Sequence, residues 1–198
     1  MEVSSSVVVW LIRHGETEWS LSGQHSGRTD LVLTARGEEE AREAGQLLAS
    51  RPFDLVLCSP LQRARKTCEI AGYADVAVID PDCAEWDYGD WSSLTLAQVR
   101  EKIPGWDIWT GPVPNGESLA EIAARARRVV ARIRESGSGT AAVFAHGHFL
   151  RIFATQWLGF PASAAANLTL HTAAISVLGY DSGFPAIRKW NIRASLSA

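Results

Sequence analysis

Histidine and arginine side chains follow several apolar runs of the chain, at the point where each run ends. Arg13 and His14 come directly after one run, and His146 comes directly after another. Arg63 lies one helical turn beyond a third run. A guanidinium group is permanently charged and its planar fork matches phosphate oxygens, while a neutral imidazole can attack phosphorus. If these residues meet, they form a site for a tetrahedral dianion with His14 as the nucleophile.

Each of these residues has an ordinary structural interpretation when it is taken alone. A single histidine at a strand end is commonly a satisfied structural residue, and an arginine such as Arg63 is commonly part of a surface ion pair. Gly15 and Gly147 stand beside the histidines and would let the backbone approach a ligand closely. The combination of histidines, arginines and glycines favours the phosphate site.

The elements that would bring these residues together alternate between strand and helix. Four short apolar runs bounded by turn residues predict strands buried on both faces, at residues 6–12, 53–58, 76–79 and 141–145. Two later runs, 173–180 and 186–192, predict a hairpin that turns at 181–183. The alternation predicts an α/β fold, a three-layer α/β/α arrangement with a mostly parallel central sheet. Ligands of such a sheet bind beyond the carboxyl ends of the strands, where the histidines and arginines stand.

Capping residues predict where two helices begin. Thr34 precedes a segment whose apolar residues share one helical face, which predicts Thr34 as an N-cap. Ser59, Pro60 and Gln62 are predicted as the N-cap, the first helical residue and the capping-box partner of a second helix. A third helix, residues 121–135, places five arginines off its apolar face, which predicts a solvated face. These arginines are Arg125, Arg127, Arg128, Arg132 and Arg134.

Length and composition favour a single globular domain, residues 1–198. The 198 residues are 46% apolar and 21% charged, and the formal net charge is −3. A nucleic-acid partner is not expected, because its phosphates call for a basic surface. The cysteines form no CxxC pair, so we expect a reducing cytoplasmic location rather than a disulfide scaffold. The first apolar run is short and no basic residue precedes it, so neither a signal peptide nor a membrane span is expected.

Residues 80–117 differ from the rest of the chain because they contain no strong strand pattern. They hold four prolines and five large aromatic residues. The aromatic residues are Trp86, Tyr88, Trp91, Trp106 and Trp109. An insertion of this kind is interpreted as a lid or pocket wall, with residues 1–79 and 118–198 as the core. A satellite cluster beneath a long loop is the alternative.

Five ordered blocks resemble the histidine phosphatase superfamily, also called the phosphoglycerate mutase-like family. The blocks are RHGETEW at 13–19 with SGRTDLVLT at 26–34, CSPLQRARKT at 58–67, EWDYGD at 85–90, NGES at 115–118 and FAHGH at 144–148. The resemblance covers nearly the whole chain. Within the superfamily, the blocks are most similar to the fungal sedoheptulose-1,7-bisphosphatase group and to mycobacterial-type acid phosphatases.

The resemblance implies a role for each matching residue. His14 would carry the phosphoryl group, and Glu85 would be the proton donor, helped by partial burial against Trp86 or by a substrate proton. The phosphate pocket would consist of Arg13, Arg63 and His146. Substrate contacts would come from Ser20, Ser26, Gly27, Tyr88, Gly147 and His148. Neither a metal nor a cofactor is expected, because the two arginines supply the positive charge.

The choice between hydrolysis and phosphoryl transfer depends on residues 80–117. They contain two bases, Arg100 and Lys102, against eight acids, and they lack the adjacent arginine pair of cofactor-dependent mutases. We therefore expect a metal-independent phosphatase whose partner is a small phosphorylated metabolite, with sugar phosphates as the favoured class. A phosphoglycerate mutase is one alternative, and a non-catalytic phospholigand-binding protein is another. A homodimer is compatible with the sequence.

Overall fold

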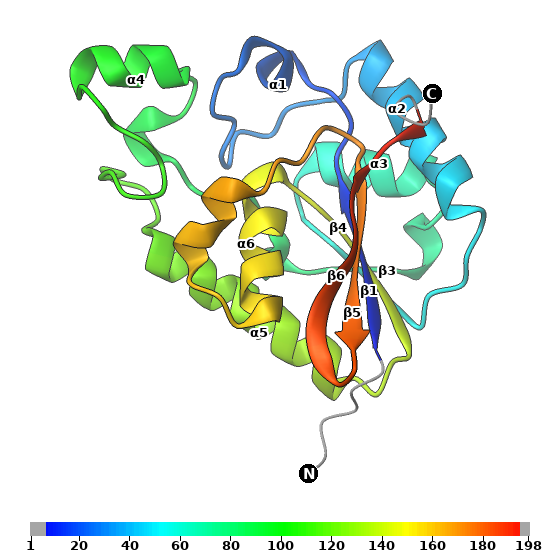
Figure 1. Ribbon diagram of the computed structural model, residues 1–198. Helices are drawn as coiled ribbons and strands as arrows, with labels where there is room; N and C mark the ends of the chain where they lie inside the picture. Colours follow the sequence, from blue (N-terminus) through cyan, green and yellow to red (C-terminus); the bar gives the residue numbers. More distant parts are fainter. Residues whose placement is uncertain (1–6, 195–198) are drawn as a thin grey trace.

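A six-stranded sheet forms the centre of the protein (Figure 1), which a computed structural model describes over residues 7–194. The strands are β1 (Val8–Arg13), β2 (Leu55–Cys58), β3 (Ala77–Ile79), β4 (Thr140–Ala145), β5 (Ile175–Asp181) and β6 (Phe184–Ile192). The strand order is β3-β2-β4-β1-β5-β6. The first four strands run parallel to one another, and β5 runs antiparallel to both of its neighbours, β1 and β6. The predicted mostly parallel sheet and its late hairpin are confirmed. Ser6, where the first strand was expected to begin, lies outside the described residues, as do both ends of the expected domain, residues 1–6 and 195–198.

Helices cover both faces of the sheet. They are α2 (Ala35–Leu48), α3 (Gln62–Ile70), α5 (Leu119–Glu135) and α6 (Gly147–Leu158). The helices α5 and α6 lie on one face, and α2 and α3 lie on the other (Figure 1). Along β1, Val9 and Leu11 pack with α5 and α6, whereas Ile12 packs with α2 and α3. Because both faces of the central strands are covered, their residues are apolar almost without interruption. The arrangement is the predicted three-layer α/β/α fold.

The register of the central strands brings three segments of the chain to one edge. Arg13 of β1 lies opposite Ala145 of β4, and the N–H of His14 donates to the carbonyl of Ala145 at 3.0 Å. On the other side of β4, the N–H of Ser59 donates to the carbonyl of Phe144 at 3.0 Å. The residues that follow β1, β2 and β4 therefore lie side by side, at the carboxyl edge where α/β sheets bind ligands.

Strand β3 differs from the predicted strand, which was expected to be buried on both faces. It has only three residues and pairs with β2 alone, at the edge of the sheet. Val78 and Ile79 are 55% and 47% exposed. The prediction was wrong because a short β-branched run has the same pattern in a central strand and in an edge strand.

The first turn of α3 also differs from the prediction. The helix begins at Gln62, and Leu61 is its N-cap without a side-chain hydrogen bond. Asp30 supplies the missing acceptor, because its Oδ1 accepts from the N–H of Gln62 at 2.7 Å. The Ser59 hydroxyl accepts from the N–H of Leu61 at 3.3 Å, one residue too early for the predicted capping box. The predicted N-cap Thr34 is confirmed at the start of α2.

Most of the arginines on α5 face outward as predicted, but Arg125 does not. Arg127, Arg128 and Arg132 are exposed, whereas Arg125 is 8% exposed. A helical pattern separates an apolar face from a polar face, and it does not show that another segment covers part of the polar face. Here that segment is residues 80–87, which lie beside α5.

Residues 80–117 form short helices and turns rather than a strand of the sheet. The helices are η2 (Pro81–Cys83), η3 (Gly89–Trp91) and α4 (Leu96–Lys102). Trp86, Trp91 and Trp106 are buried in the same apolar cluster as α5 and α6. The aromatic residues therefore extend the main core, and the satellite-cluster interpretation does not hold.

The remaining short helices are α1 (Glu18–Ser22), η1 (Ala74–Val76) and η4 (Ala162–Asn167). All three cysteines are buried free thiols. Within residues 7–194, no helix has the length and the apolar composition needed to cross a membrane.

Candidate active site

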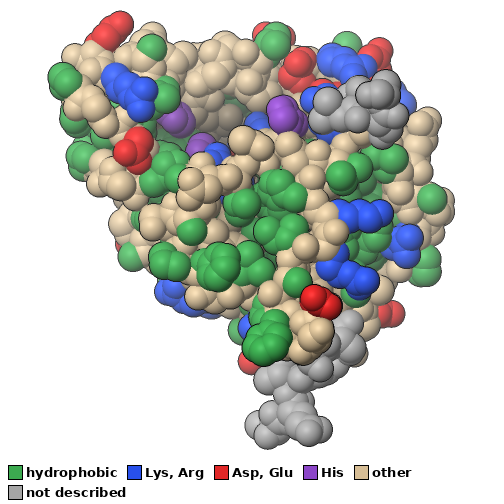
Figure 2. Space-filling model, in the orientation of Figure 1, with side chains coloured by type: hydrophobic (Ala, Val, Ile, Leu, Met, Phe, Trp, Pro, Cys, Tyr) green, Lys and Arg blue, Asp and Glu red, His purple; other side chains and the backbone are tan. Residues whose placement is uncertain are grey.

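A cavity of about 200 Å³ opens at the carboxyl edge of the sheet. Figure 2 shows it as a hollow near the top of the molecule, with histidine and basic side chains around it. Eight of the predicted site residues line the cavity: Arg13, His14, Ser20, Ser26, Glu85, Tyr88, Gly147 and His148. The other three, Gly27, Arg63 and His146, are buried and do not line the cavity. Predicted residues from five separate parts of the chain thus meet in one place.

His14 is held in the form that a nucleophile requires. Its ring Nδ1 lies 2.7 Å from the carbonyl oxygen of Gly15, and only a protonated Nδ1 can donate to a carbonyl. Burial lowers the pKa of His14 well below its usual value, and the charges of Arg63 and Arg13 lower it further. A neutral imidazole with its proton on Nδ1 keeps the lone pair on Nε2. The second ring nitrogen is therefore the one that can attack phosphorus.

His146 stands next to His14, with 5.3 Å between the ring centroids. Its Nε2 lies 2.6 Å from the Ser59 hydroxyl. Burial lowers the pKa of His146 well below its usual value, and the charge of Arg63 acts in the same direction. The ring is therefore neutral near pH 7. His146 supplies a hydrogen-bonding group beside His14 without adding a positive charge.

Three polar atoms near His14 are buried and have no hydrogen-bond partner within the described part of the chain. They are Nε of Arg13, Nε of Arg63 and Nδ1 of His146. Buried polar groups are nearly always paired, because an unpaired group loses its hydration without compensation. The two Nε–H groups can only donate, and an oxyanion is the acceptor that suits a guanidinium group best. The arrangement is complementary to a bound anion.

The two arginines are fixed by backbone carbonyls. Arg13 donates through Nη1 to the carbonyl of Leu170. Arg63 is fully buried, and its Nη1 and Nη2 donate to the carbonyls of Thr29 at 2.8 Å and Gly27 at 2.9 Å. Burial lowers the pKa of both guanidinium groups, and the carboxylate of Glu85 opposes that effect. Both groups keep their charge near pH 7 because the starting value is so high.

Gly15 and Gly147 each make room for a neighbouring part of the protein. A Cβ at Gly15 would lie 2.2 Å from the carbonyl oxygen of Gly37, so Gly15 permits the close approach of α2. A Cβ at Gly147 would lie 3.3 Å from the guanidinium carbon of Arg13. Gly147 therefore leaves room for the Arg13 side chain at the start of α6.

Glu85 lies at the N-terminus of α6 and is 6% exposed. Its Oε1 accepts from the N–H groups of Trp86 and Phe149, both at 2.9 Å. Its Oε2 accepts from the N–H of His148 at 3.2 Å. Both oxygens act as acceptors, so the carboxylate is oriented at the cavity wall by three backbone donors.

Gly27 and Ser20 both make contacts within the protein that support the site. Gly27 has a φ of 49°, and a Cβ there would lie 3.1 Å from the Tyr88 ring; its carbonyl holds Arg63. Ser20 lines the cavity, but its hydroxyl donates to the carbonyl of Thr17 at 2.9 Å as part of the cap of α1. Its hydroxyl would have to rotate in order to reach a ligand.

Tyr88 and His148 form one wall of the cavity, and the Tyr88 hydroxyl is 2.5 Å from Nδ1 of His148. Burial raises the pKa of Tyr88 well above its usual value, and the carboxylate of Glu85 raises it further. Burial also lowers the pKa of His148 well below its usual value. The protonated phenol therefore donates to Nδ1, which places the His148 proton on Nε2. The ring of His25 packs on Tyr88 with 4.8 Å between centroids and also lines the cavity.

Arg151 lines the cavity but was missed by the sequence prediction. Its Nε and Nη2 donate to the carbonyl of Ala165 at 3.0 and 2.8 Å, and its guanidinium group lies 4.6 Å from the centre of the Trp109 ring. The available signal was its position three residues after His148, on the same face of a helix. Leu170 was also missed, and it follows no motif.

Comparisons with known proteins agree with this geometry. The family model of the histidine phosphatase superfamily (branch 1) matches residues 9–193. An acid phosphatase of Mycobacterium tuberculosis is 40% identical, over 87% of this chain and 86% of that protein. A sedoheptulose 1,7-bisphosphatase of Saccharomyces cerevisiae is 35% identical, over 75% of this chain and 66% of that protein.

A solved structure from Mycobacterium tuberculosis has the same fold. It superposes with a TM-score of 0.88 and 36% identity, covering 94% of this chain and 97% of that chain. The expected resemblance is confirmed by the family match and by these relatives. The chain is an enzyme of the histidine phosphatase superfamily.

Proposed function

We propose that the protein is a metal-independent phosphomonoesterase that acts through phosphorylated His14. The observation that carries the proposal is the setting of His14, which is buried, bonded through Nδ1 to Gly15 and flanked by Arg13 and Arg63. The lone pair on Nε2 attacks phosphorus. The two guanidinium groups supply the positive charge that a metal ion supplies in other phosphatases.

In the first step, Nε2 of His14 forms a bond to phosphorus while the bond between phosphorus and the ester oxygen breaks. Arg13, Arg63 and His146 donate hydrogen bonds to the equatorial oxygens, where negative charge builds up. Glu85, which reaches the cavity, delivers a proton to the leaving alkoxide. The Glu85 carboxylate is arranged as an acceptor. It must therefore take up this proton from the substrate or from solvent before the step begins. The alcohol leaves, and the phosphoryl group remains on His14.

In the second step, water attacks the phosphohistidine. The Glu85 carboxylate, left ionised by the first step, accepts a proton from this water as the new bond to phosphorus forms. The bond from phosphorus to Nε2 breaks, and inorganic phosphate leaves with the oxygen of water. Glu85 then passes the proton to the departing phosphate or to solvent, which returns His14 and Glu85 to their starting states.

Small phosphorylated metabolites, with sugar phosphates as the favoured class, fit the cavity. Its volume of about 200 Å³ suits a small metabolite rather than a macromolecule. His25, His148 and Arg151 also line the cavity and offer polar groups to hydroxyls. One relative at 35% identity is a sedoheptulose bisphosphatase, whose substrate is a phosphorylated sugar.

The contacts of the only bases in residues 80–117 favour hydrolysis over the mutase alternative. Arg100 donates to the carbonyl of Trp106 at 2.8 Å, and Lys102 lies 5.9 Å from the centre of the Trp91 ring. Neither base lines the cavity, so this segment adds no cation to hold a phosphoglycerate carboxylate or to retain the phosphoenzyme against water.

The test combines a variant with a substrate panel. His14→Ala removes the nucleophile, and we expect turnover of p-nitrophenyl phosphate to fall below detection, whereas His171→Gln, an exposed residue outside the cavity, should keep wild-type activity. The panel holds sugar phosphates, phosphoglycerates and nucleotides, assayed with and without EDTA. Undiminished activity of His14→Ala would contradict the mechanism, and loss of activity in EDTA would contradict metal independence. Isomerisation of 3-phosphoglycerate without release of phosphate would favour a mutase, and ligand binding without any turnover would favour a binding protein.

A further inference from the structure

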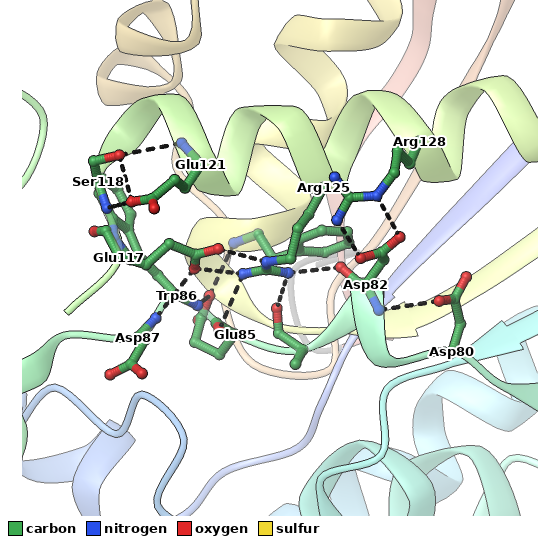
Figure 3. Close-up of polar contacts among 12 residues, drawn as sticks. Asp80, Asp82, Glu85, Trp86, Asp87, Glu117, Ser118, Glu121, Arg125 and Arg128 are labelled. Atoms are coloured by element: carbon green, nitrogen blue, oxygen red, sulfur yellow. Dashed lines mark hydrogen bonds and ion pairs between the residues drawn. The ribbon is translucent and has the colours of Figure 1, made fainter.

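Arg125 is a buried charge that the proposed reaction does not use. It lies on α5, and its side chain is only 9% exposed, although its neighbours Arg127 and Arg128 face solvent. Figure 3 shows that Arg125 points from the helix into the segment that carries Glu85. A buried guanidinium group needs partners for its five donors, and here those partners connect the helix to the cavity wall.

The first set of partners consists of backbone carbonyls at or just before Glu85. Nη1 of Arg125 donates to the carbonyls of Asp82 at 2.6 Å and Ala84 at 2.9 Å. Nη2 donates to the carbonyl of Glu85 itself at 3.4 Å. These bonds fix the backbone from which the Glu85 side chain extends.

The second partner is the carboxylate of Glu117, which binds Arg125 through two oxygens at 2.6 and 2.7 Å. The backbone of Glu117 holds the residues after Glu85. Its carbonyl accepts from the indole N–H of Trp86 at 2.6 Å, and its N–H donates to the carbonyl of Asp87 at 2.9 Å. The Arg125–Glu117 pair therefore holds the chain on both sides of Glu85 (Figure 3).

A third contact reaches the donors that orient the carboxylate. The guanidinium carbon of Arg125 lies 5.5 Å from the centre of the Phe149 ring. The N–H of Phe149 is one of the three backbone donors to the Glu85 carboxylate. Arg125 thus packs against the residue that holds the carboxylate and bonds to the backbone that carries it.

We propose that Arg125 and Glu117 are positioning residues that hold Glu85 at the leaving-group oxygen. The inference rests on the proposed function, in which Glu85 protonates that oxygen. Proton transfer requires hydrogen-bond distance between the two oxygens, and a displacement of about 1 Å is enough to cost a large part of the rate. Neither residue lines the cavity.

The experiment compares two substrates that differ in their need for a proton. p-Nitrophenyl phosphate releases a weakly basic phenolate, whereas glycerol 1-phosphate releases a strongly basic alkoxide. Arg125→Lys keeps the charge pair with Glu117 but cannot reach all three carbonyls. We expect it to lower kcat/KM for glycerol 1-phosphate about tenfold more than for p-nitrophenyl phosphate, a fraction of the full effect of a general acid. The quantity is kcat/KM because it reports the phosphorylation step and not the later hydrolysis of phosphohistidine.

A double variant separates positioning from general damage. Glu85→Gln should change the ratio of the two kcat/KM values by more than Arg125→Lys does. Adding Arg125→Lys to Glu85→Gln should then leave that ratio unchanged, because the positioned group is already absent. Arg128→Met is the matched control: it removes an exposed arginine of the same helix that bonds the Asp82 carboxylate at 2.9 and 2.6 Å, and it should not alter the ratio.

The outcomes distinguish the inference from the function on which it rests. A shifted ratio in Glu85→Gln without a shift in Arg125→Lys overturns the positioning role alone. An equal loss for both substrates in Arg125→Lys, or a shift that adds to that of Glu85→Gln, also overturns it. No shift in Glu85→Gln removes the proposed general acid and the inference with it. If Arg125→Lys does not fold, Glu117→Asp keeps both charges, withdraws the carboxylate by one methylene and is subject to the same expectations.

Discussion

The two sides of the candidate site are held by different kinds of structure. On one side, Arg13, His14 and His146 stand at the ends of β1 and β4, whose backbones are joined along their whole length by parallel pairing. On the other side, Glu85 and Tyr88 belong to residues 80–117, which contribute no strand to the sheet. That segment is held by its aromatic residues, which pack into the main core, and by individual hydrogen bonds such as those of Arg125 and Trp86.

The difference between the two sides corresponds to the two parts of a substrate: the phosphate, which is the same in every substrate, and the alcohol, which varies. Every phosphomonoester carries the same phosphate, and a rigid sheet edge can hold its donors in one fixed geometry. The leaving alcohol differs between substrates, and in the proposed reaction it faces Glu85 and therefore residues 80–117. Substitutions in residues 80–117 can therefore change which alcohol is accepted without moving the phosphate donors. The three predictions below test this separation, from the largest effect to the smallest.

Arg63→Lys should lower kcat/KM for every phosphomonoester to the same extent, whatever its leaving group. Lysine keeps the charge but cannot bond Thr29, Gly27 and an oxyanion together, so we expect kcat/KM to fall about 100-fold or more. The fall should be equal for p-nitrophenyl phosphate and glycerol 1-phosphate, and inhibition by inorganic phosphate should weaken as well. Arg65→Lys, an exposed position of the same helix, is the control. A loss confined to the alkyl ester would break the separation of the two sides.

The buried histidines should make stability depend on pH. Burial lowers the folded-state pKa of His14, His146 and His148 below the unfolded value of about 6.5, so below that pH the unfolded chain binds more protons. The free energy of unfolding should therefore fall as the pH drops from 6.5 towards the lowered values, by about 1.4 kcal/mol per pH unit for each histidine. Urea unfolding between pH 7.5 and pH 5.5, roughly one unit either side of that value, measures this slope.

Variants of single histidines show which side of the site contributes to the pH dependence of the free energy of unfolding. His148→Gln, at the contact with Tyr88, should remove about a quarter of the slope if the four histidines whose pKa burial lowers, His25 included, contribute equally. Identical slopes in the wild type and in His148→Gln would show that the wall formed by Tyr88 and His148 takes no part in this titration.

Tyr88→Phe should produce the smallest effect, and only on the leaving-group side. It removes the hydrogen bond to Nδ1 of His148 and keeps the ring in place, so kcat/KM for an alkyl phosphate should fall by roughly two- to tenfold, as for one hydrogen bond. The inhibition constant of inorganic phosphate should stay within about twofold of the wild type, because no donor to the phosphate is changed. Phosphate inhibition that weakens as much as turnover does would show that the two sides are not independent.

Burial and helix capping are predicted only in part from this sequence. The apolar runs of the central strands are unmistakable because both of their faces are covered, yet the same kind of run at residues 76–79 became an exposed edge strand. Ser59 has the residue type of an N-cap, but Asp30, far away in the chain, caps the helix instead. Local patterns do not contain the distant partner that decides such cases.

The sequence by itself determined the type and the order of the chemical groups. The ends of parallel strands meet at one edge of a sheet, so the meeting of Arg13, His14 and His146 was predictable. Glu85 was predictable only through the family motif, because no periodicity marks it. Tertiary structure alone decided that Arg125 is buried against the segment of Glu85, that Arg151 reaches the cavity and that Gly15 makes room for α2. The physical reason is that burial and close approach depend on which segments fold against each other, and spacing along one helix or strand does not contain that information.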